Sequence, residues 1–307
     1  MRWKVAWPQG AIFSYASGAS RAMGDRQHLE ERMAKAATDL RMDEVRLAKS
    51  SDPTPGDLLA GDVRNYALFL DCDGTLLDIA PTPNEVVVPA KLVETLVRIY
   101  KGLGGALAIL TGRQLAEIDT LMKPAMFVGS GVHGGELRTT TGGAIARVAT
   151  SLPASLVEEV IRRAQKLPGI IAEPKGPGLA VHYRLAPHLK DALEAELRGL
   201  LTQYPEGLVL CHGRKLFEII PAGHSKGTAL ETILALPEFA GRRPIMIGDD
   251  MGDIPAFAAA RHHGGVGLRV AGEQFGTDVE LESPQRVFAW LTRFAEQLET
   301  APRPRSS

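Results

Sequence analysis

The chain has few cysteines, no long apolar run and no excess of charge of one sign. Its 307 residues include two cysteines, Cys72 and Cys211, which argues against a disulfide framework and favours a reducing, cytoplasmic compartment. No apolar run reaches the length that spans a bilayer. A net charge of −1 without a basic block excludes a footprint for nucleic acid or an acidic membrane, so we expect a small-molecule partner.

The first 60 residues stand apart in composition from the rest of the chain. Residues 1–24 contain no Asp or Glu and no continuous apolar stretch, so they make no convincing secretory signal and are predicted to be disordered. Residues 25–49 have a charged helical pattern, typical of a solvated helix or tail. Residues 50–61, with two prolines and two glycines, form a predicted linker. Translation from an internal Met is the alternative interpretation of this segment.

Two carboxylates lie two residues apart at the end of a predicted strand. Asp71 and Asp73 directly follow the apolar run 66–70. Side chains alternate in an extended chain, so these two acids share one side while Cys72 turns into the sheet. Gly74 then permits a sharp turn that a Cβ would resist.

Acids this close together repel each other unless a cation lies between them, and Mg²⁺ with oxygen ligands suits the pair. A carboxylate beside Mg²⁺ and a phosphate can attack phosphorus to form an acyl phosphate. The second carboxylate can protonate the leaving oxygen and later activate water. A solvated Asp-Gly turn is the alternative that this stretch alone leaves open.

Three further motifs arrive in an order that suits phosphate chemistry. Thr111 opens the tripeptide TGR after a predicted strand, and Lys226 lies near the start of a helical pattern. Asp249, Asp250 and Asp253 follow a third predicted strand. Taken singly, TGR is usually a turn from strand to helix and Lys226 most often a solvated residue at a helix start, and Asp249 and Asp250 could simply cap a helix. Their joint occurrence at strand ends of one α/β chain favours a phosphoryl-transfer site.

The order DxDGT, TGR, Lys and GDDxxxD resembles the haloacid dehalogenase superfamily of phosphatases. Additional segments resemble the trehalose-6-phosphate phosphatase family within that superfamily, and the likeness extends over about residues 65–298. These more specific segments are residues 76–89, 131–134, 173–176, 182–184 and 218–221.

Alternating strands and helices predict an α/β fold with a doubly wound parallel sheet, which the resemblance identifies as a haloacid dehalogenase-like core. Residues 61–147 and 222–301 are expected to form this core. Residues 148–221 follow an αββαββ pattern and are expected to form an inserted small α/β cap, here called the cap. Residues 1–60 are an N-terminal extension and linker, and residues 302–307 are a tail.

Substrate selection is expected in the cap, because the core motifs contact only phosphate and metal. Period-2 alternation groups polar residues of the cap strands in pairs on one face: Glu173 with Lys175, His182 with Arg184, and Arg214 with Glu218. Alternating donors and acceptors suit the ring hydroxyls of a sugar. A solvated sheet face with cross-strand ion pairs is the alternative, and the resemblance favours the sugar site.

The resemblance implies an Mg²⁺-dependent phosphatase of trehalose biosynthesis that hydrolyses trehalose 6-phosphate to trehalose and phosphate. Asp71 would be the nucleophile, Asp73 the general acid and base, and Thr111 and Lys226 the ligands of the phosphoryl group. The expected metal ligands are Asp71, the backbone carbonyl of Asp73, and Asp249, supported by Asp250 or Asp253. Substrate contacts are expected at Arg113, His133, Glu173, Lys175, His182, Arg184, Arg214 and Glu218.

The chain departs from the family pattern in two places. Gly252 and Ile254 stand where the family usually has Thr and Glu, which predicts metal binding with weakened support from neighbouring side chains. Arg214, followed by Lys215, stands where the family usually has Lys, and a guanidinium does not replace an ammonium in a sugar contact.

Other interpretations of the same residues remain open or are disfavoured. A phosphatase for sucrose phosphate or a phosphorylated glycoside would share the core and differ in the cap. A sugar-phosphate sensor without activity is disfavoured, because Asp71, Asp73 and Lys226 are all present. A thiol phosphatase needs an Arg six residues after its Cys, and Asp78 occupies that position after Cys72. The sequence carries no signal for or against association with the trehalose-phosphate synthase that makes the substrate.

Overall fold

The apolar run Tyr66–Leu70 forms β1, and all five of its residues are buried. Burial on both faces is typical of an inner strand of a parallel sheet. β1 pairs in parallel with β10 on one side and with β2 on the other. The computed structural model describes residues 54–79, 85–204, 207–213, 215–270 and 281–301.

The large sheet has seven strands in the order β11-β10-β1-β2-β3-β4-β5. The first five strands are parallel, as the sequence predicts, whereas β4 and β5 extend the sheet in antiparallel fashion beyond β3. The other strands are β2 (Leu107–Leu110), β3 (Val128–Gly131), β4 (Glu136–Arg138), β5 (Ala146–Arg147), β10 (Arg243–Gly248) and β11 (Val266–Arg269).

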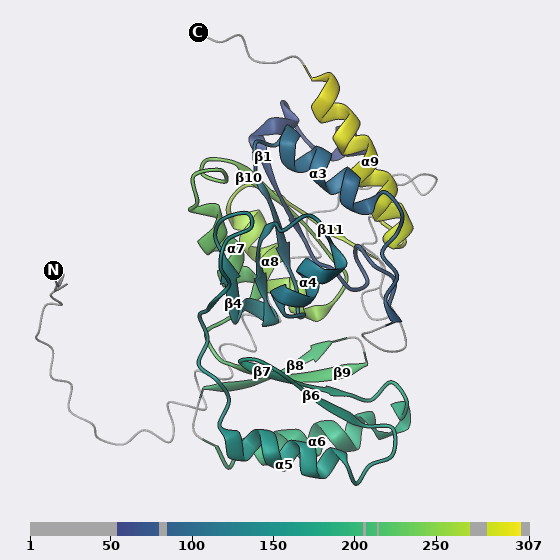
Figure 1. Cartoon of the computed structure of the whole chain (residues 1–307), viewed down its shortest axis with the longest axis vertical. Helices are drawn as coiled ribbons and strands as arrows, with labels where there is room; N and C mark the ends of the chain where they lie inside the picture. The colour runs from purple at the N-terminus through teal and green to yellow at the C-terminus, as the bar shows by residue number, and fades with distance from the viewer. Residues whose placement is uncertain (1–53, 80–84, 205–206, 214, 271–280, 302–307) are drawn as a thin grey trace, which may run out of the picture. The chain divides into compact units, whose positions relative to one another are not determined.

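Helices cover both faces of this sheet, which makes it doubly wound as expected. Figure 1 shows α3 beside α9 on one side of the sheet and α7 beside α8 on the other. Within each pair the two helices pack against each other. The helices are α3 (Leu92–Gly102), α4 (Leu115–Leu121), α7 (Lys226–Leu234), α8 (Ile254–His262) and α9 (Pro284–Thr300), with 3₁₀ turns η1 (Val63–Asn65), η3 (Val132–Gly134) and η5 (Met251–Asp253).

A second, antiparallel sheet lies in the chain between β5 and α7, and its strand order is β6-β7-β9-β8. Figure 1 shows α5 and α6 together on one of its faces. This inserted α/β unit is the cap domain that the sequence predicts. Its elements are α5 (Ala154–Ala164), β6 (Ile171–Lys175), β7 (Gly178–His182), η4 (Pro187–Leu189), α6 (Lys190–Leu201), β8 (Leu208–Gly213) and β9 (Leu216–Pro221).

Alternation along the cap strands separates an apolar face from a polar one. Val181 of β7 and Phe217 of β9 are buried in the cluster formed with α5 and α6. The next residues along these strands, His182 and Glu218, therefore point to the opposite face. The apolar layer fixes the register, and the register decides which polar side chains are available to a ligand.

Local backbone conformation decides where some helices begin. α3 begins at Leu92, because Lys91 has a left-handed backbone conformation with φ 70°. The segment from Pro187 to Leu201 divides into the 3₁₀ turn η4 and the helix α6. Such end effects do not alter the topology.

The predicted linker contains structure close to the core. Residues Pro55–Leu58 form the short helix α2, and Leu59 is buried in the main hydrophobic cluster. The predicted charged helix at residues 25–49 lies outside the described residues. In the described part of the chain, no helix is both long and apolar enough to cross a membrane.

Replacing Phe69 by Ala is expected to lower the free energy of unfolding by about 3 to 5 kcal/mol, because the ring is fully buried on β1 and packs on Phe239 at 5.6 Å between centroids. Chemical denaturation measures this loss. Val87→Ala is the control, since Val87 is 78% exposed and its truncation should change stability by less than about 0.5 kcal/mol. Equal effects of the two substitutions would contradict the placement of β1 inside the sheet.

Candidate active site

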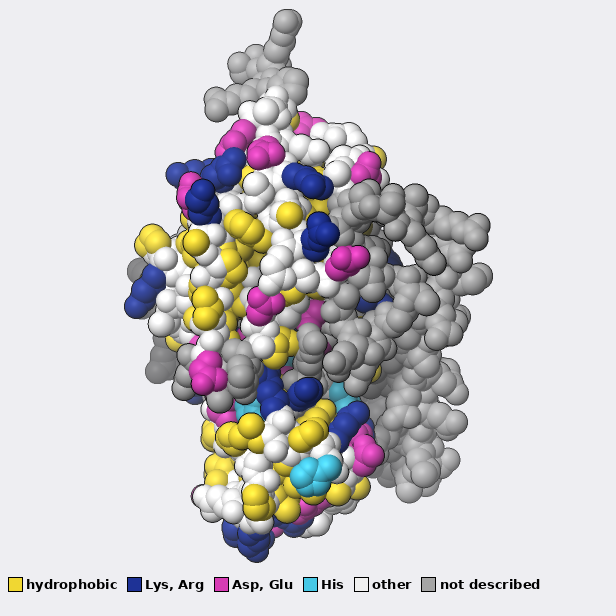
Figure 2. Space-filling view, turned by 90° about the vertical axis from the view of Figure 1, so that its right-hand side faces the viewer, with side chains coloured by type: hydrophobic (Ala, Val, Ile, Leu, Met, Phe, Trp, Pro, Cys, Tyr) yellow, Lys and Arg dark blue, Asp and Glu magenta, His cyan; other side chains and the backbone are white. Residues whose placement is uncertain are grey.

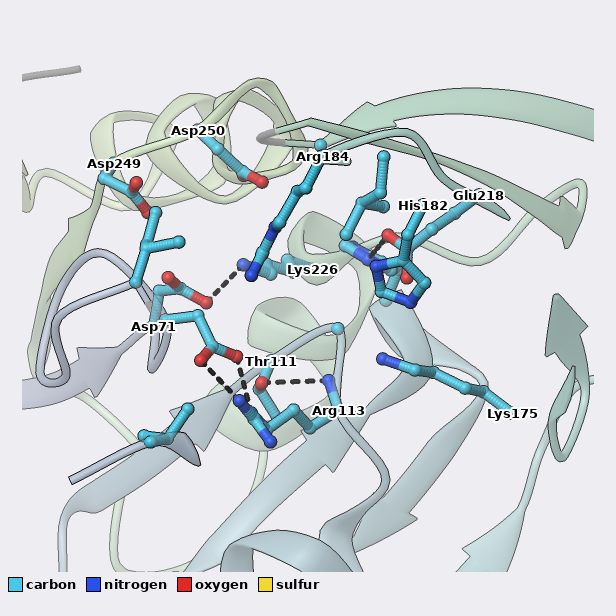
Figure 3. A pocket seen from close by; sticks show the side chains of 17 residues that line it. Asp71, Thr111, Arg113, Lys175, His182, Arg184, Glu218, Lys226, Asp249 and Asp250 are labelled. Atoms are coloured by element: carbon cyan, nitrogen blue, oxygen red, sulfur yellow. Dashed lines mark hydrogen bonds and ion pairs between the residues drawn. The ribbon is translucent and has the colours of Figure 1, made fainter. Parts of the chain in front are cut away.

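Three parallel strands end at one edge of the large sheet and deliver the predicted residues there. Asp71 follows β1, Thr111 follows β2 and Asp249 follows β10. The carboxyl ends of neighbouring parallel strands meet at the same edge, where α/β proteins bind ligands. All three residues line one pocket together with Lys226 from the first turn of α7 (Figure 3). Folding therefore brings the four sequence motifs into one site.

Lys226 is a buried ammonium that joins two of the motif carboxylates. Its Nζ donates hydrogen bonds of 2.6 Å to Asp71 Oδ1 and 2.6 Å to Asp253 Oδ1. Burial opposes the charge, but attraction to Asp253 and Asp71 raises the pKa of Lys226 well above its ordinary value. The N-cap Ser225, which accepts from Thr228 N at 3.1 Å, fixes the helix start that carries this lysine.

Asp73 and Arg113 form a bidentate pair at the pocket. Arg113 Nε donates to Asp73 Oδ2 at 2.6 Å, and Arg113 Nη2 donates to Asp73 Oδ1 at 2.7 Å. The Asp73 side chain remains 33% exposed, so it is open to the pocket while the guanidinium holds its orientation. Arg113, predicted to contact substrate, thus also orients the predicted acid and base.

Cys72 stands between Asp71 and Asp73 in the sequence. Its side chain is fully buried and does not line the pocket. Burial, followed by the nearby charge of Asp73, raises the pKa of the Cys72 thiol well above its ordinary value. A thiol this hard to ionise is a poor nucleophile. The geometry agrees with the prediction that Cys72 serves as a small apolar residue.

The carboxylates of Asp71, Asp249 and Asp253 form a buried cluster. One oxygen of each lies within 4.8 Å of the others. Burial, followed by repulsion from Asp71, raises the pKa of Asp249 to about 10. Burial likewise raises the pKa of Asp71 to about 6 and that of Asp253 to about 6, despite the attraction of Lys226. One ammonium does not offset three buried acids.

This donor set fits a hard divalent cation such as Mg²⁺, because the clustered side chains offer carboxylate oxygens and the single ammonium of Lys226 leaves them short of positive charge. Asp250 also lines the pocket, and burial raises its pKa above the ordinary value. Asp253 does not line the pocket. Its Oδ2 instead accepts from the backbone N–H groups of Asp249 at 3.0 Å and Asp250 at 3.1 Å, which holds the turn that carries them.

Gly74 is required by a close approach as well as by its backbone. Its φ is 84°, in the left-handed region, as expected for the sharp turn after Asp73. A Cβ at this position would lie 2.0 Å from Asp249 Oδ2. The glycine therefore lets the loop after β1 approach the loop after β10.

The cap contributes four of the predicted substrate residues to the pocket lining, namely Lys175, His182, Arg184 and Glu218. In Figure 3 the Arg184 side chain points from the cap toward Asp71 and Lys226. Figure 2 shows Lys, Arg and His side chains gathered between the body that holds the large sheet and the one that holds the small sheet. The polar face of the cap thus closes one side of the pocket.

The remaining predicted cap residues differ in placement. Glu173 is not part of the lining, and its Oε2 instead pairs with His182 Nε2 at 2.8 Å. This hydrogen bond holds the pKa of Glu173 below its ordinary value. Glu173 therefore acts on the pocket through His182. Arg214 lies outside the described residues, and its predicted sugar contact stays a prediction.

His133 and Glu218 form an ion pair between the core and the cap. His133 belongs to η3 after β3, and Glu218 belongs to β9. Burial opposes the charge of both groups, but their mutual attraction raises the pKa of His133 and lowers that of Glu218 to about 2. Both side chains line the pocket.

Sequence reasoning missed the apolar part of the pocket wall. Ile79, Val86 and Leu216 line the pocket beside the charged groups, as do Gly112 and Gly213. Ile79 and Val86 fall in the segment 76–89 that carries the family resemblance, which was the available signal for them. Leu216 lies on β9 two residues before Glu218, so the same period-2 alternation predicts its face.

The fold is similar to that of phosphatases of the haloacid dehalogenase superfamily. The C-terminal domain of Candida albicans trehalose-6-phosphate phosphatase superposes with a TM-score of 0.67 at 20% identity, covering 75% of this chain and 92% of that one. A phosphatase of the same superfamily from Bacteroides thetaiotaomicron superposes with a TM-score of 0.50 at 19% identity, covering 79% and 97%.

Sequence comparison identifies the family to which the chain belongs. The family model described as trehalose-phosphatase matches residues 69–283. A probable trehalose-phosphate phosphatase of Sinorhizobium fredii is 39% identical over 76% of this chain and 90% of the relative, and the trehalose-6-phosphate phosphatase of Escherichia coli is 33% identical over 76% and 88%. The chain belongs to the trehalose-phosphatase family and is a phosphoric monoester hydrolase.

The buried acids predict how stability depends on pH and Mg²⁺. Between the ordinary carboxyl pKa of about 4 and the raised values of about 6 and about 10, the folded metal-free protein holds more protons than the unfolded chain. Its melting temperature should therefore fall as the pH rises from 5 to 8. Added Mg²⁺ should raise the melting temperature more at pH 8, where fewer protons compete for the carboxylates.

Asp249→Asn should flatten the pH dependence and weaken the response to Mg²⁺, because it removes the carboxylate with the highest pKa from the cluster. Differential scanning fluorimetry of EDTA-treated protein with and without Mg²⁺ measures both effects. Asp78→Asn is the matched control and should change neither effect. The Asp78 side chain is exposed, and its Oδ2 accepts a hydrogen bond from Gln285 Nε2 at 2.6 Å. An Asp249→Asn protein that responds to Mg²⁺ as the wild type does would rule Asp249 out as a ligand.

Proposed function

We propose that this protein hydrolyses trehalose 6-phosphate to trehalose and phosphate, as a step in trehalose biosynthesis. The observation that carries the proposal is the composition of the pocket: one side offers Asp71, Thr111 and Lys226 for a phosphate, and the cap side offers His182 and Glu218 for sugar hydroxyls. Membership of the trehalose-phosphatase family supports the same substrate.

In the proposed mechanism Asp71 is the nucleophile. Its carboxylate oxygen bonds to phosphorus while the bond from phosphorus to the sugar oxygen breaks, which leaves an aspartyl phosphate. Lys226 binds one Asp71 oxygen at 2.6 Å and so keeps the carboxylate ionised and in place. The hydroxyl of Thr111, at the end of β2, and the Lys226 ammonium hold the transferring phosphoryl oxygens.

Asp73 is the proposed general acid and base. Its proton passes to the leaving sugar oxygen in the first half-reaction, and it takes a proton from the attacking water in the second, which releases phosphate and regenerates Asp71. Arg113, which donates to both oxygens of the ionised Asp73, orients this carboxyl at the pocket, and the bond to one of these oxygens must loosen when that oxygen carries the proton. Closure by the cap limits the water that reaches the intermediate.

Asp71, the Asp73 carbonyl and Asp249 would hold Mg²⁺, with Asp250 in the pocket and with Asp253 fixing the turn. When bound, the cation offsets the negative charge of the phosphate and the carboxylates. Gly252 supports this arrangement with a backbone N–H that donates to Asp250 Oδ1 at 2.9 Å. Backbone donors therefore supply part of the support expected from the side chains that the chain lacks at Gly252 and Ile254.

We also propose a division of the chain into domains and a cellular compartment for the protein. Residues 61–147 and 222–301 are proposed as the phosphatase core and residues 148–221 as the substrate-selecting cap. The low cysteine content, two residues in the whole sequence, supports a reducing, cytoplasmic setting.

A substrate panel tests the proposal directly. Purified protein with Mg²⁺ should release phosphate from trehalose 6-phosphate in preference to glucose 6-phosphate, sucrose 6-phosphate and p-nitrophenyl phosphate, and EDTA should stop the release. Activity spread evenly across the panel would retain the phosphatase chemistry and remove trehalose 6-phosphate as the selected substrate. A preference for sucrose 6-phosphate would establish the alternative sugar-phosphate phosphatase.

Asp71→Asn should lower phosphate release by about a thousandfold or more, because the amide cannot form the acyl phosphate. The amide oxygen still accepts a hydrogen bond from Lys226, so circular dichroism should show a folded protein. Asp191→Asn, on an exposed position of α6, is the matched control and should retain activity. A folded Asp71→Asn protein with normal turnover would remove Asp71 from its proposed role.

A further inference from the structure

His133 lies in a loop whose backbone is held in an unusual conformation. Val132 and His133 have φ values of 49° and 51°, in the left-handed region that β-branched residues rarely adopt. Such a conformation persists only where the surroundings enforce it, and it is often found at functional sites. The strained backbone therefore points to a function of the imidazole at this position.

Backbone hydrogen bonds fasten this loop to the phosphate end of the site. His133 N donates to Thr111 O at 3.1 Å, and Val132 N donates to Arg113 O at 3.0 Å. Gly134 lies against the helix start that carries Lys226, because a Cβ there would be 2.7 Å from Ser225 N. The base of the imidazole is thus fixed relative to the groups proposed to bind the phosphoryl group.

Two glycines leave space for the ring. A Cβ on Gly112 would lie 2.5 Å from His133 Nε2, and a Cβ on Gly252 would lie 3.1 Å from Asp250 Oδ1 and 3.2 Å from both Cε1 and Nδ1 of His133. The backbone of neither glycine has a positive φ, so the close approach explains the absence of a side chain better than backbone conformation does. The imidazole is packed between the loop after β2 and the loop after β10.

The ring nitrogen beside Gly112 also reaches the cap. His133 Nε2 pairs with Glu218, whose side chain is 7% exposed and faces the pocket. A carboxylate this buried needs a partner of opposite charge. Removing the His133 imidazole would leave the Glu218 carboxylate without that partner and without a fixed orientation. Figure 3 shows Glu218 on the opposite side of the pocket from Asp71.

We infer that His133 is a positioning residue that holds Glu218 of the cap at a set distance from the phosphate-binding groups, within the space left by Gly112 and Gly252. The inference rests on the proposed function and deepens it. Glu218 accepts a hydrogen bond from a sugar hydroxyl, and His133 sets where that acceptor stands relative to the scissile phosphate ester. His133 thereby selects a sugar phosphate whose hydroxyl and phosphate are the right distance apart, and it need not touch the sugar itself.

The test compares kcat and KM for trehalose 6-phosphate and for p-nitrophenyl phosphate, which has no sugar hydroxyls. In His133→Ala the ratio of the two kcat/KM values should fall by between about tenfold and about a hundredfold, with a rise in KM for the sugar ester. Glu218→Ala should give a similar loss. The double variant should lose no more than Glu218→Ala alone, because His133 acts through Glu218.

Gly252→Ala gives an independent test that keeps the histidine. Its methyl group should press on the imidazole and lower the same ratio, and it should have no further effect in the His133→Ala background. Thermal unfolding reports which variants are native, and if His133→Ala does not fold, the ratio in Gly252→Ala alone still tests the inference. His212→Ala is the matched control: His212 pairs with Glu194 at 3.0 Å in the same cap, lies outside the pocket lining and should leave the ratio unchanged.

The possible failures are distinguishable. Multiplicative losses in the double variant, or an equal effect of Gly252→Ala with and without His133, would overturn the inference while the wild type still prefers trehalose 6-phosphate. A wild-type protein that hydrolyses the aryl ester without preferring the sugar ester would overturn the proposed function and the inference with it.

Discussion

The buried ammonium of Lys226 is the interaction on which the rest of the site depends. It pairs with Asp71 and Asp253 at 2.6 Å each, at the point where β1, β10 and α7 meet. Asp71 faces the pocket, whereas Asp253 holds the backbone that carries Asp249 and Asp250. One cation therefore aligns the proposed nucleophile with the turn that bears the acids proposed to bind metal. The cluster still has more buried acids than cations, and a bound divalent ion would offset this imbalance.

The two sheets contribute different groups to the pocket. The large sheet brings strand ends together and so supplies a rigid platform for a phosphate. The small sheet presents one polar face, because its other face is packed on α5 and α6. The pair of His133 and Glu218 joins these parts inside the pocket. In the proposed function the groups that carry the chemistry and the groups that select the substrate come from different sheets, and the distance between them becomes a property of the site.

Much of the fold was predictable because it depends on local patterns. The buried strand Tyr66–Leu70 was predicted to the residue, since five apolar residues end abruptly at two acids and a glycine. The doubly wound sheet and the inserted cap followed from the order of elements. The antiparallel strands β4 and β5 were missed because they are short and carry little alternation. Residues at strand ends, such as Asp71 and Thr111, were predictable as site members because topology places all such ends together.

By itself the sequence determined which residue types stand at which strand ends, and with them the class of chemistry and the family. Only the tertiary structure decided which charges meet. The pairing of Asp73 with Arg113, of Lys226 with two acids, and of His133 with Glu218 joins residues far apart in the chain. No local pattern encodes such pairs, because each depends on the packing of whole elements. The spaces at Gly112 and Gly252 have the same origin, since a glycine in the sequence does not state which side chain fills the place of its missing Cβ.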